Sequence, residues 1–247
     1  MNTDLASGEA LARTVGAECV PGLGSLDVVV FPPFPYLQSV GGALQGSAIE
    51  LGAQDLSSEA NGALTGEVSA EMLMDLGVAW VLVGHSERRH RLGESEALVE
   101  EKLTMALESG LSAVLCVGET LEQRRAGRAH EIVRHQLTSA LHRLSADFAR
   151  EIVIAYEPVW AIGTGVAATA SDAREAHHEI REFMSSRYDS ELASGVRIVY
   201  GGSLVPGNAK TIFAELGVDG GLVGGASLKA GDFLSICSAA TIGIAAG

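Results

Sequence analysis

The chain is organised around the segment Ala155-Tyr156-Glu157-Pro158-Val159-Trp160-Ala161-Ile162-Gly163-Thr164-Gly165. It follows the apolar, β-branched run 151–154, which is typical of a strand buried on both faces. Glu157 would then stand at the carboxyl end of that strand, where parallel α/β folds place their chemistry. Pro158 opposes an immediate helix, and the glycines of 163–165 would let backbone amides approach an anion. The segment predicts a base beside a glycine-containing lid; the alternative is an ordinary turn with a solvated glutamate.

The length and composition suit one large α/β domain, although 247 residues could also form two small ones. We expect a single domain over residues 1–247. A hydrophobic content of 47% with only 5% aromatic residues indicates a core of Ala, Val, Leu and Ile. The net charge of −14 argues against nucleic acid or an anionic membrane surface as the main partner. An anionic substrate would therefore need a locally positive site.

The cysteines and the N-terminus indicate where the protein works. Cys19, Cys116 and Cys237 are far apart, odd in number and without metal-ligand spacing, so we expect no metal site and a reducing, cytoplasmic setting. The N-terminus has no basic segment followed by an apolar core, and no apolar run is long enough to span a bilayer. We therefore expect a soluble protein that is not exported.

The hydrophobic pattern predicts strands and helices in strict alternation. The predicted strands are 27–31, 49–53, 80–83, 113–117, the run 151–154 that leads to Glu157, 196–200 and 221–223. The predicted helices are 5–17, 36–44, one from Ser69, 95–109, 121–144, 171–187, one through Lys210 and one from about Asp232. Such alternation requires a parallel sheet with right-handed crossovers, and the length is typical of an eight-fold α/β barrel, the TIM-type (β/α)8 fold. Seven strands with eight helices would leave two exposed edges, so the count predicts that a strand is missing upstream of Met1.

Strand ends converge on one face of such a barrel. The residues at or just past the predicted ends are His85, Glu119, Glu157, Gly163, Ser203, Gly224 and Gly225. His85 precedes Ser86-Glu87, which is typical of a helix start, and the amide-rich N-terminus of a helix disfavours the imidazolium form. His85 is therefore either a neutral electrophile or a structural histidine.

Two late glycine turns, Gly201-Gly202-Ser203 and Gly224-Gly225, have the composition of a phosphate site. Glycine lets main-chain amides come close to phosphate oxygens, and no lysine or arginine is then required. They could also be only tight turns. A base, a neutral donor and an amide cradle together suggest proton transfer next to a carbonyl in a small phosphorylated sugar.

Several ordered motifs resemble those of one family. They are Phe31-Pro32-Pro33-Phe34-Pro35-Tyr36, Gly52-Ala53-Gln54, Leu64-Thr65-Gly66-Glu67-Val68-Ser69, Gly84-His85-Ser86-Glu87-Arg88-Arg89, Tyr156 to Gly165, Tyr200-Gly201-Gly202-Ser203 and Leu222-Val223-Gly224-Gly225-Ala226-Ser227. On these motifs the sequence resembles the triosephosphate isomerase family along nearly its whole length. The resemblance implies interconversion of dihydroxyacetone phosphate and D-glyceraldehyde 3-phosphate through an enediolate, without a cofactor or a metal.

The resemblance also assigns roles to residues. Glu157 matches the family's catalytic base and His85 its neutral electrophile, while Gly163, Ser203, Gly224 and Gly225 match positions whose backbone amides hold the phosphate. Residues 158–166 would form the lid. Loop 57–67 resembles the family's dimer arm, with its tip near Thr65, which implies a homodimer; the alternative is a disordered surface loop.

The match departs from the family at the N-terminus. The first strand of the family ends in Asn-x-Lys-Met-Asn, and Met1-Asn2 aligns with the last two residues, so we expect the catalytic lysine and its strand to be absent. Lys102, Lys210 and Lys229 all fall on or beside predicted helices. Either the start was placed at an internal methionine or the chain is naturally short and weakly active or inactive. A non-catalytic phosphate-binding barrel and a poorly folded fragment are the rival interpretations.

Overall fold

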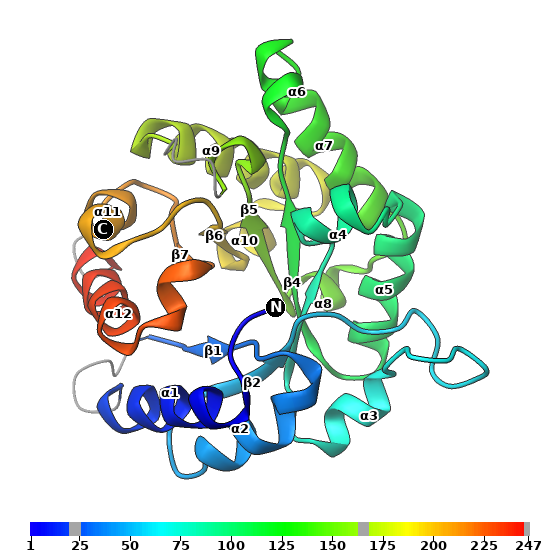
Figure 1. Ribbon diagram of the computed structural model, residues 1–247. Helices are drawn as coiled ribbons and strands as arrows, with labels where there is room; N and C mark the ends of the chain where they lie inside the picture. The colour runs from blue at the N-terminus through cyan, green and yellow to red at the C-terminus, as the bar shows by residue number, and fades with distance from the viewer. Residues whose placement is uncertain (20–25, 163–167, 245–247) are drawn as a thin grey trace.

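The computed structural model describes residues 1–19, 26–162 and 168–244, and it contains one parallel sheet (Figure 1). The strands are β1 Val29–Val30, β2 Glu50–Ala53, β3 Trp80–Val83, β4 Ser112–Val117, β5 Ile152–Tyr156, β6 Arg197–Tyr200 and β7 Gly220–Gly221. Each strand pairs in parallel with the next one along the chain, from β1 to β7. Because parallel neighbours need crossover connections, a helix follows each strand on the outside of the curved sheet.

The predicted seven-stranded parallel sheet is confirmed. In the described part of the chain β1 and β7 each pair on one side only, so a closed ring is not formed there. Both end strands are only two residues long, whereas segments 27–31 and 221–223 were expected to be longer. A strand with one neighbour makes half the ladder hydrogen bonds of a central strand, which explains the shortening.

The prediction of eight helices is wrong, because the described residues form twelve α-helices and three 3-10 helices. The α-helices are α1 Leu5–Glu18, α2 Leu37–Ala43, α3 Ala70–Asp75, α4 Ser86–Arg91, α5 Glu96–Glu108, α6 Leu121–Arg125, α7 Ala129–Ala140, α8 Ala146–Ala149, α9 Ala170–Arg187, α10 Ser190–Gly195, α11 Pro206–Phe213 and α12 Ala230–Ile244. The 3-10 helices are η1 Phe34–Tyr36, η2 Val159–Ala161 and η3 Gly225–Leu228. The predicted helix 121–144 is interrupted because Gly127 adopts a left-handed conformation with φ 71°.

Side-chain caps fix the beginnings of several helices. The Ser69 hydroxyl accepts a hydrogen bond from the backbone of Met72, which confirms Ser69 as the start of α3. Thr120 and Thr169 make capping boxes at α6 and α9, so the two helices that flank the end of β5 have well-defined first turns.

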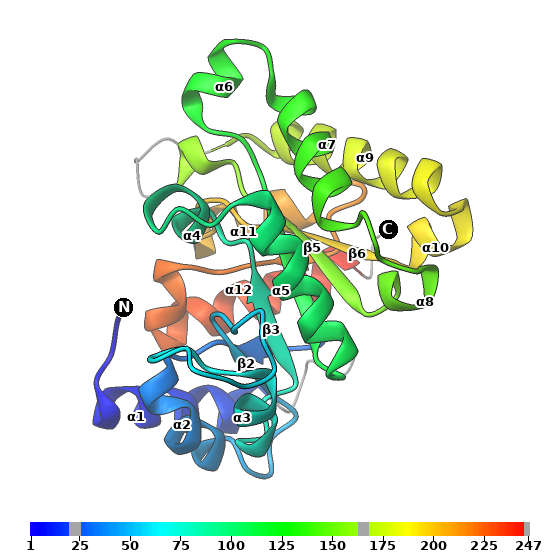
Figure 2. The same cartoon turned by 90° about the vertical axis from the view of Figure 1, so that its right-hand side faces the viewer.

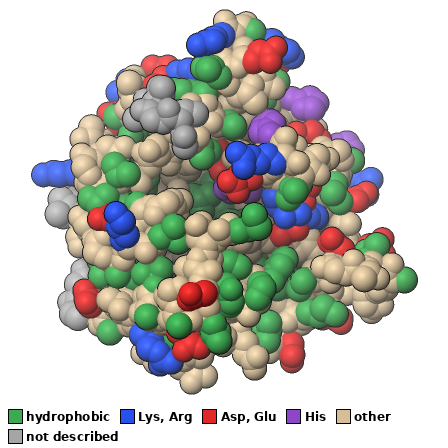
Figure 3. All heavy atoms as spheres, viewed as in Figure 1, with side chains coloured by type: hydrophobic (Ala, Val, Ile, Leu, Met, Phe, Trp, Pro, Cys, Tyr) green, Lys and Arg blue, Asp and Glu red, His purple; other side chains and the backbone are tan. Residues whose placement is uncertain are grey.

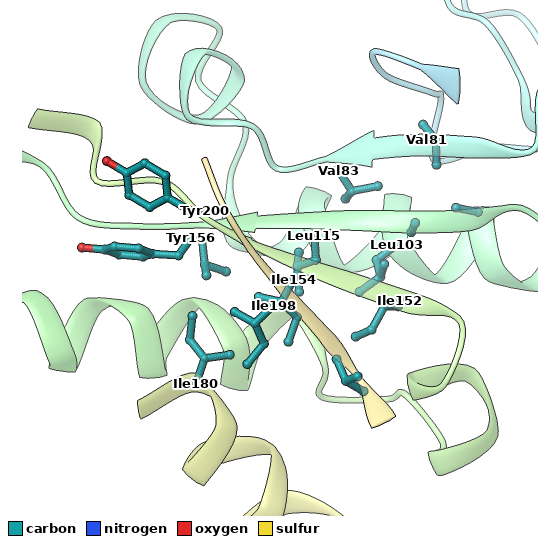
Figure 4. Close-up of a cluster of buried hydrophobic side chains, with 14 of the residues drawn as sticks. Val81, Val83, Leu103, Leu115, Ile152, Ile154, Tyr156, Ile180, Ile198 and Tyr200 are labelled. Atoms are coloured by element: carbon teal, nitrogen blue, oxygen red, sulfur yellow. The ribbon is translucent and has the colours of Figure 1, made fainter. Parts of the chain in front are cut away.

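The core has two layers because strand side chains alternate between the two faces of the sheet. On β5, Ile152, Ile154 and Tyr156 belong to the large outer cluster, and Figure 4 shows this layer meeting Leu103 and Ile180 from the covering helices. The inner cluster consists of Leu82, Val114, Cys116, Val153 and Ala155. Both faces of the central strands are therefore buried, which accounts for their uninterrupted apolar sequences.

The inner register continues past the end of β5. Val153 and Ala155 face inward, so the same alternation directs Glu157 toward the interior at the carboxyl end of the sheet. Figure 2 shows α4, which begins directly after β3, toward the same end of the molecule as the N-terminus. Among the described helices, none combines the length and the apolar character that crossing a bilayer requires.

Candidate active site

Glu157 is buried at the end of β5, with 2% of its surface exposed. Its Oε2 atom accepts a hydrogen bond from the backbone N–H of Ser86 at 2.8 Å, and its Oε1 atom accepts one from the Ser86 hydroxyl at 3.3 Å. Burial raises the pKa of the Glu157 carboxyl, although the hydrogen bonds from Ser86 and the positive charge of Arg89 act in the opposite direction. The site thus holds a carboxylate in a poorly solvated place, where it is a stronger base than in water.

His85 faces this carboxylate from the start of α4. Its Nε2 atom lies 3.0 Å from Oε1 of Glu157, and its Nδ1 atom accepts a hydrogen bond from the backbone N–H of Glu87 at 3.3 Å. An acceptor nitrogen carries no proton, so we assign the neutral tautomer in which Nε2–H donates to Glu157. The structure therefore brings together the two residues that the sequence predicted as a base and a neutral donor.

Close backbone packing fixes the position of Glu157. A Cβ atom on Gly118 would overlap the carbonyl oxygen of Glu157, and one on Gly201 would lie 3.0 Å from its Cγ atom. The backbone N–H of Glu157 donates to the carbonyl of Val117 at 2.7 Å. The ends of β4 and β6 therefore approach the end of β5 closely only because both turns carry glycine.

Sequence reasoning did not identify Ser86 or Arg89 as partners of the site. Arg89 Nε donates to the carbonyl of Gly84 at 2.6 Å, and its Nη2 atom donates to the carbonyl of Cys116 at 3.1 Å. Arg89 thereby ties the end of β3 to β4, the strand that separates His85 from Glu157. The only sequence signal for these roles was the polar run 84–89 directly after a strand.

Glu119, also a predicted strand-end residue, does not join the pair. It is fully buried, and its carboxylate accepts hydrogen bonds from Tyr156 Oη, Trp160 Nε1 and Arg124 Nη1. The Arg124 guanidinium lies 4.5 Å from the centroid of the Trp160 ring and also pairs with Asp172. Glu119 therefore holds the residues that flank the end of β5 and has no free oxygen to offer a substrate.

The late glycine turns lie on the wall of the same cavity as the pair. This cavity has a volume of about 1970 Å³, and His85, Glu157, Ser203, Gly224 and Gly225 all line it. Figure 3 shows the molecule hollowed near the centre of the face seen in Figure 1, with charged side chains beside the hollow. A Cβ atom on Gly224 or Gly225 would meet nothing within 4 Å, so the protein leaves space beside both residues.

Parts of the prediction lie outside the described residues. Gly163, the remaining predicted phosphate ligand, is one of them, as is most of the predicted lid after η2. Loop 57–67 is described and projects from the body of the protein beyond α3 (Figure 1). A hydrogen bond of 2.8 Å from the N–H of Ser57 to the carbonyl of Val68 closes its base, and most of its residues are exposed.

The three lysines of the chain occupy different surroundings. Lys102 is buried and makes ion pairs with Asp55 at 2.7 Å and with Glu94 at 2.5 Å. These two carboxylates balance its positive charge. Lys210 lies on α11 and lines the cavity, whereas Lys229 precedes α12. Within the described ranges no group of three or more His, Cys, Asp or Glu side chains could hold a metal ion.

Comparison with known proteins gives a consistent result. The sequence model of the triosephosphate isomerase family matches residues 1–240. The triosephosphate isomerase of Magnetococcus marinus is 45% identical over 243 residues, which cover 98% of this chain and 95% of the relative. That of Herminiimonas arsenicoxydans is 48% identical over 240 residues, covering 97% and 96%, and that of Thermoanaerobacter pseudethanolicus is 50% identical over 210 residues, covering 85% of each. The chain therefore belongs to the triosephosphate isomerase family.

Proposed function

We propose that this protein interconverts dihydroxyacetone phosphate and D-glyceraldehyde 3-phosphate through an enediolate. The observation that carries the proposal is the contact of 3.0 Å between His85 Nε2 and Glu157 Oε1 on the wall of the cavity that the glycine turns also line. Family membership and similarity over 98% of the chain support catalysis over a merely structural role for the pair.

Glu157 is the proposed base. It removes a proton from the carbon beside the carbonyl of the substrate and returns that proton to the neighbouring carbon, which converts ketose into aldose. Its burial supports this role because the raised pKa of the carboxyl brings it closer to neutral pH. The Ser86 N–H, which holds Oε2, orients the carboxylate before substrate binds.

His85 is the proposed electrophile. Its Nε2–H donates to Glu157 in this structure, so a substrate carbonyl oxygen that displaces this contact would receive the hydrogen bond as negative charge develops on it. A neutral imidazole suits this role, since it polarises the carbonyl without holding the enediolate as a tight ion pair.

Ser203, Gly224 and Gly225 are the proposed phosphate ligands through their backbone amides. The free space beside the two glycines supports this assignment, because nothing in the protein competes with an anion there. The same role for Gly163 rests on the family resemblance alone. We further propose that the protein needs no cofactor, works in the cytoplasm and forms a homodimer through loop 57–67, whose exposed Leu64 is available to a second copy.

A non-catalytic phosphate-binding barrel remains the second candidate function. It is favoured by one observation, the open space beside Gly224 and Gly225, which can hold a phosphate whether or not His85 and Glu157 act on the ligand. Binding of a phosphate ligand would then occur without turnover.

The two functions are separated by assaying the 247-residue chain with each triose phosphate in deuterated water. We expect conversion in both directions with deuterium incorporated at the carbon next to the carbonyl, and a loss of about 10²–10⁴-fold in kcat for Glu157→Gln. Glu131→Gln, which removes an exposed carboxylate paired with Arg128, is the matched control and should keep full activity. Inorganic phosphate binding by calorimetry without any deuterium exchange would reject the isomerase and support the binding protein.

A further inference from the structure

Two cysteines that the proposed reaction does not use lie where the first and last helices pack together. Cys19 caps the carboxyl end of α1, and Cys237 lies within α12, which packs against α1. Both are free and buried in one apolar cluster, and each thiol affects the pKa of the other, so the two side chains are neighbours across the contact of α1 with α12. The third cysteine, Cys116, lies apart from them in the inner cluster of β4.

We propose that Cys19 and Cys237 form a reversible intramolecular disulfide that cross-links α1 to α12 when the protein meets an oxidising environment. Thiols that are neighbours on two packed helices can be joined when side-chain rotation brings the sulfur atoms to the length of a disulfide bond. Both side chains belong to the same apolar cluster, so both sulfur atoms have apolar neighbours. In the described ranges no third ligand completes a metal site around them, which favours dithiol chemistry.

The reaction needs an oxidant, for which we name a low-molecular-weight disulfide such as oxidised glutathione. One cysteine thiolate attacks the glutathione disulfide, forms a mixed disulfide and releases one glutathione thiol. The second cysteine then attacks the protein sulfur of the mixed disulfide and releases the other glutathione thiol. Overall two protein thiols lose two electrons and two protons, and one glutathione disulfide becomes two thiols.

The surroundings of the two cysteines should make disulfide formation slow, but they leave the oxidant a path to one sulfur atom. Burial raises the pKa of the Cys19 thiol and raises that of Cys237 to about 12, so little thiolate exists at neutral pH and the rate should increase with pH. Cys237 lines the cavity of about 1970 Å³, which gives a small oxidant a path to its sulfur. The bond is therefore suited to sustained oxidation and unsuited to rapid signalling.

The position of the bond gives it a structural effect. Strand β1 follows α1 and strand β7 precedes α12, and these are the two end strands that are not paired with each other in the described residues. A bond between residues 19 and 237 closes a loop around nearly the whole chain, which strongly restricts the unfolded state. Oxidation should therefore stabilise the protein at the open side of the sheet.

The test is incubation of the purified chain with oxidised glutathione at pH 8.5, followed by thiol titration in denaturant, peptide mapping and thermal unfolding. We expect the free thiols to fall from three to one, a Cys19–Cys237 cross-linked peptide, and a rise in Tm of roughly 5–15 °C that dithiothreitol reverses. Cys19→Ala and Cys237→Ala should each lose the rise in Tm under the same treatment.

The wild-type measurement decides the proposal even if a variant fails to fold. Retention of three free thiols, a stable mixed disulfide with glutathione, a bond that includes Cys116, or a bond between two chains would each overturn it. None of these readouts depends on turnover, so the result is independent of the proposed isomerase activity.

Discussion

The Nε2 atom of His85 lies 3.0 Å from Oε1 of Glu157, although β4 separates the strands that carry the two residues. The contact exists because β4 pairs in register with both neighbours: Val83 at the end of β3 lies opposite Leu115, and Tyr156 at the end of β5 lies opposite Val117. His85 follows the shorter strand by two residues and Glu157 follows the longer one directly, so the two side chains start at nearly the same level. Changes that shift either register should therefore disturb the site before they unfold the protein.

Glu157→Gln should stabilise the protein while it lowers the kcat of the proposed reaction by about 10²–10⁴-fold. The folded state raises the pKa of this carboxyl by burial, so the charged form is disfavoured in the folded state. Below the unfolded-state pKa of about 4.3 the carboxyl is protonated in both states and does not lower the free energy of unfolding. As pH rises through the folded-state pKa, the unfolded state is increasingly favoured and the wild-type protein loses stability. Urea unfolding should show the variant more stable at pH 7 and the difference shrinking toward pH 4. A constant difference across this range would contradict the assignment.

Gly118→Ala should displace Glu157 without touching its side chain. The added Cβ would overlap the carbonyl oxygen of Glu157, so the backbone must shift, at a cost of about 1–3 kcal/mol. We expect kcat of the proposed reaction to fall at least ~10-fold, since small misplacements of a catalytic group are costly. Gly207→Ala on α11, where an added Cβ meets nothing within 4 Å, is the control and should keep full activity. Equal stability and activity for the two variants would contradict this account.

Lys102→Met should destabilise the fold strongly. Lys102 pairs with Asp55 and Glu94, which also pair with Arg88, so its removal leaves buried carboxylates short of positive charge. Breaking a buried ion pair from one side typically costs about 3–5 kcal/mol, measurable by denaturant unfolding. Arg128→Gln, at an exposed ion pair, provides the comparison and should have no measurable effect. An unchanged denaturation midpoint for Lys102→Met would show that the cluster is not important for stability.

Arg124→Gln should change the surroundings of Trp160. The guanidinium lies over this ring and also binds Glu119 and Asp172, so its loss should uncover one face of the indole and shift the fluorescence to longer wavelength. The chain has two tryptophans, and a Trp80→Phe background isolates the signal. Arg124→Lys should restore it only in part, because lysine keeps the charge and loses the planar stacking.

Arg125→Gln, on the same helix with an exposed side chain, is the matched control for this experiment. It should leave the emission of Trp160 unchanged. An identical spectral shift for the variants at 124 and 125 would mean that the stacking does not determine the environment of the indole.

The apolar strands were predictable because their pattern is local. The run that ends in Glu157 is buried on both faces as its sequence indicated, and the inward register of Val153 and Ala155 continues to the glutamate. The helix count failed partly because Gly127, inside a periodic pattern, adopts a positive φ that the pattern does not reveal. It failed also because α4, α8 and α10 are too short to show a helical period.

The partners of the site were harder to predict than its position. The hydrogen bond from Ser86 to Glu157 joins residues 71 positions apart and depends on the register of an intervening strand. Glu119 also follows the end of a strand, yet its carboxylate lies on the outer face of the sheet, where it accepts hydrogen bonds from Tyr156 and Trp160. A position at a strand end thus limits where a side chain can act, but the neighbours it meets decide what it does.

Pairing of each strand only with its neighbours in the chain also bears on how the protein is made. The strands that lead to His85 and Glu157, and the strand between them, are all encoded by residue 157, so a nascent chain can pair these three strands before Gly201 packs against Glu157. Such a sheet can add one strand and helix at a time during translation. Because its strands pair with neighbours in the sequence, few contacts between distant segments must form first.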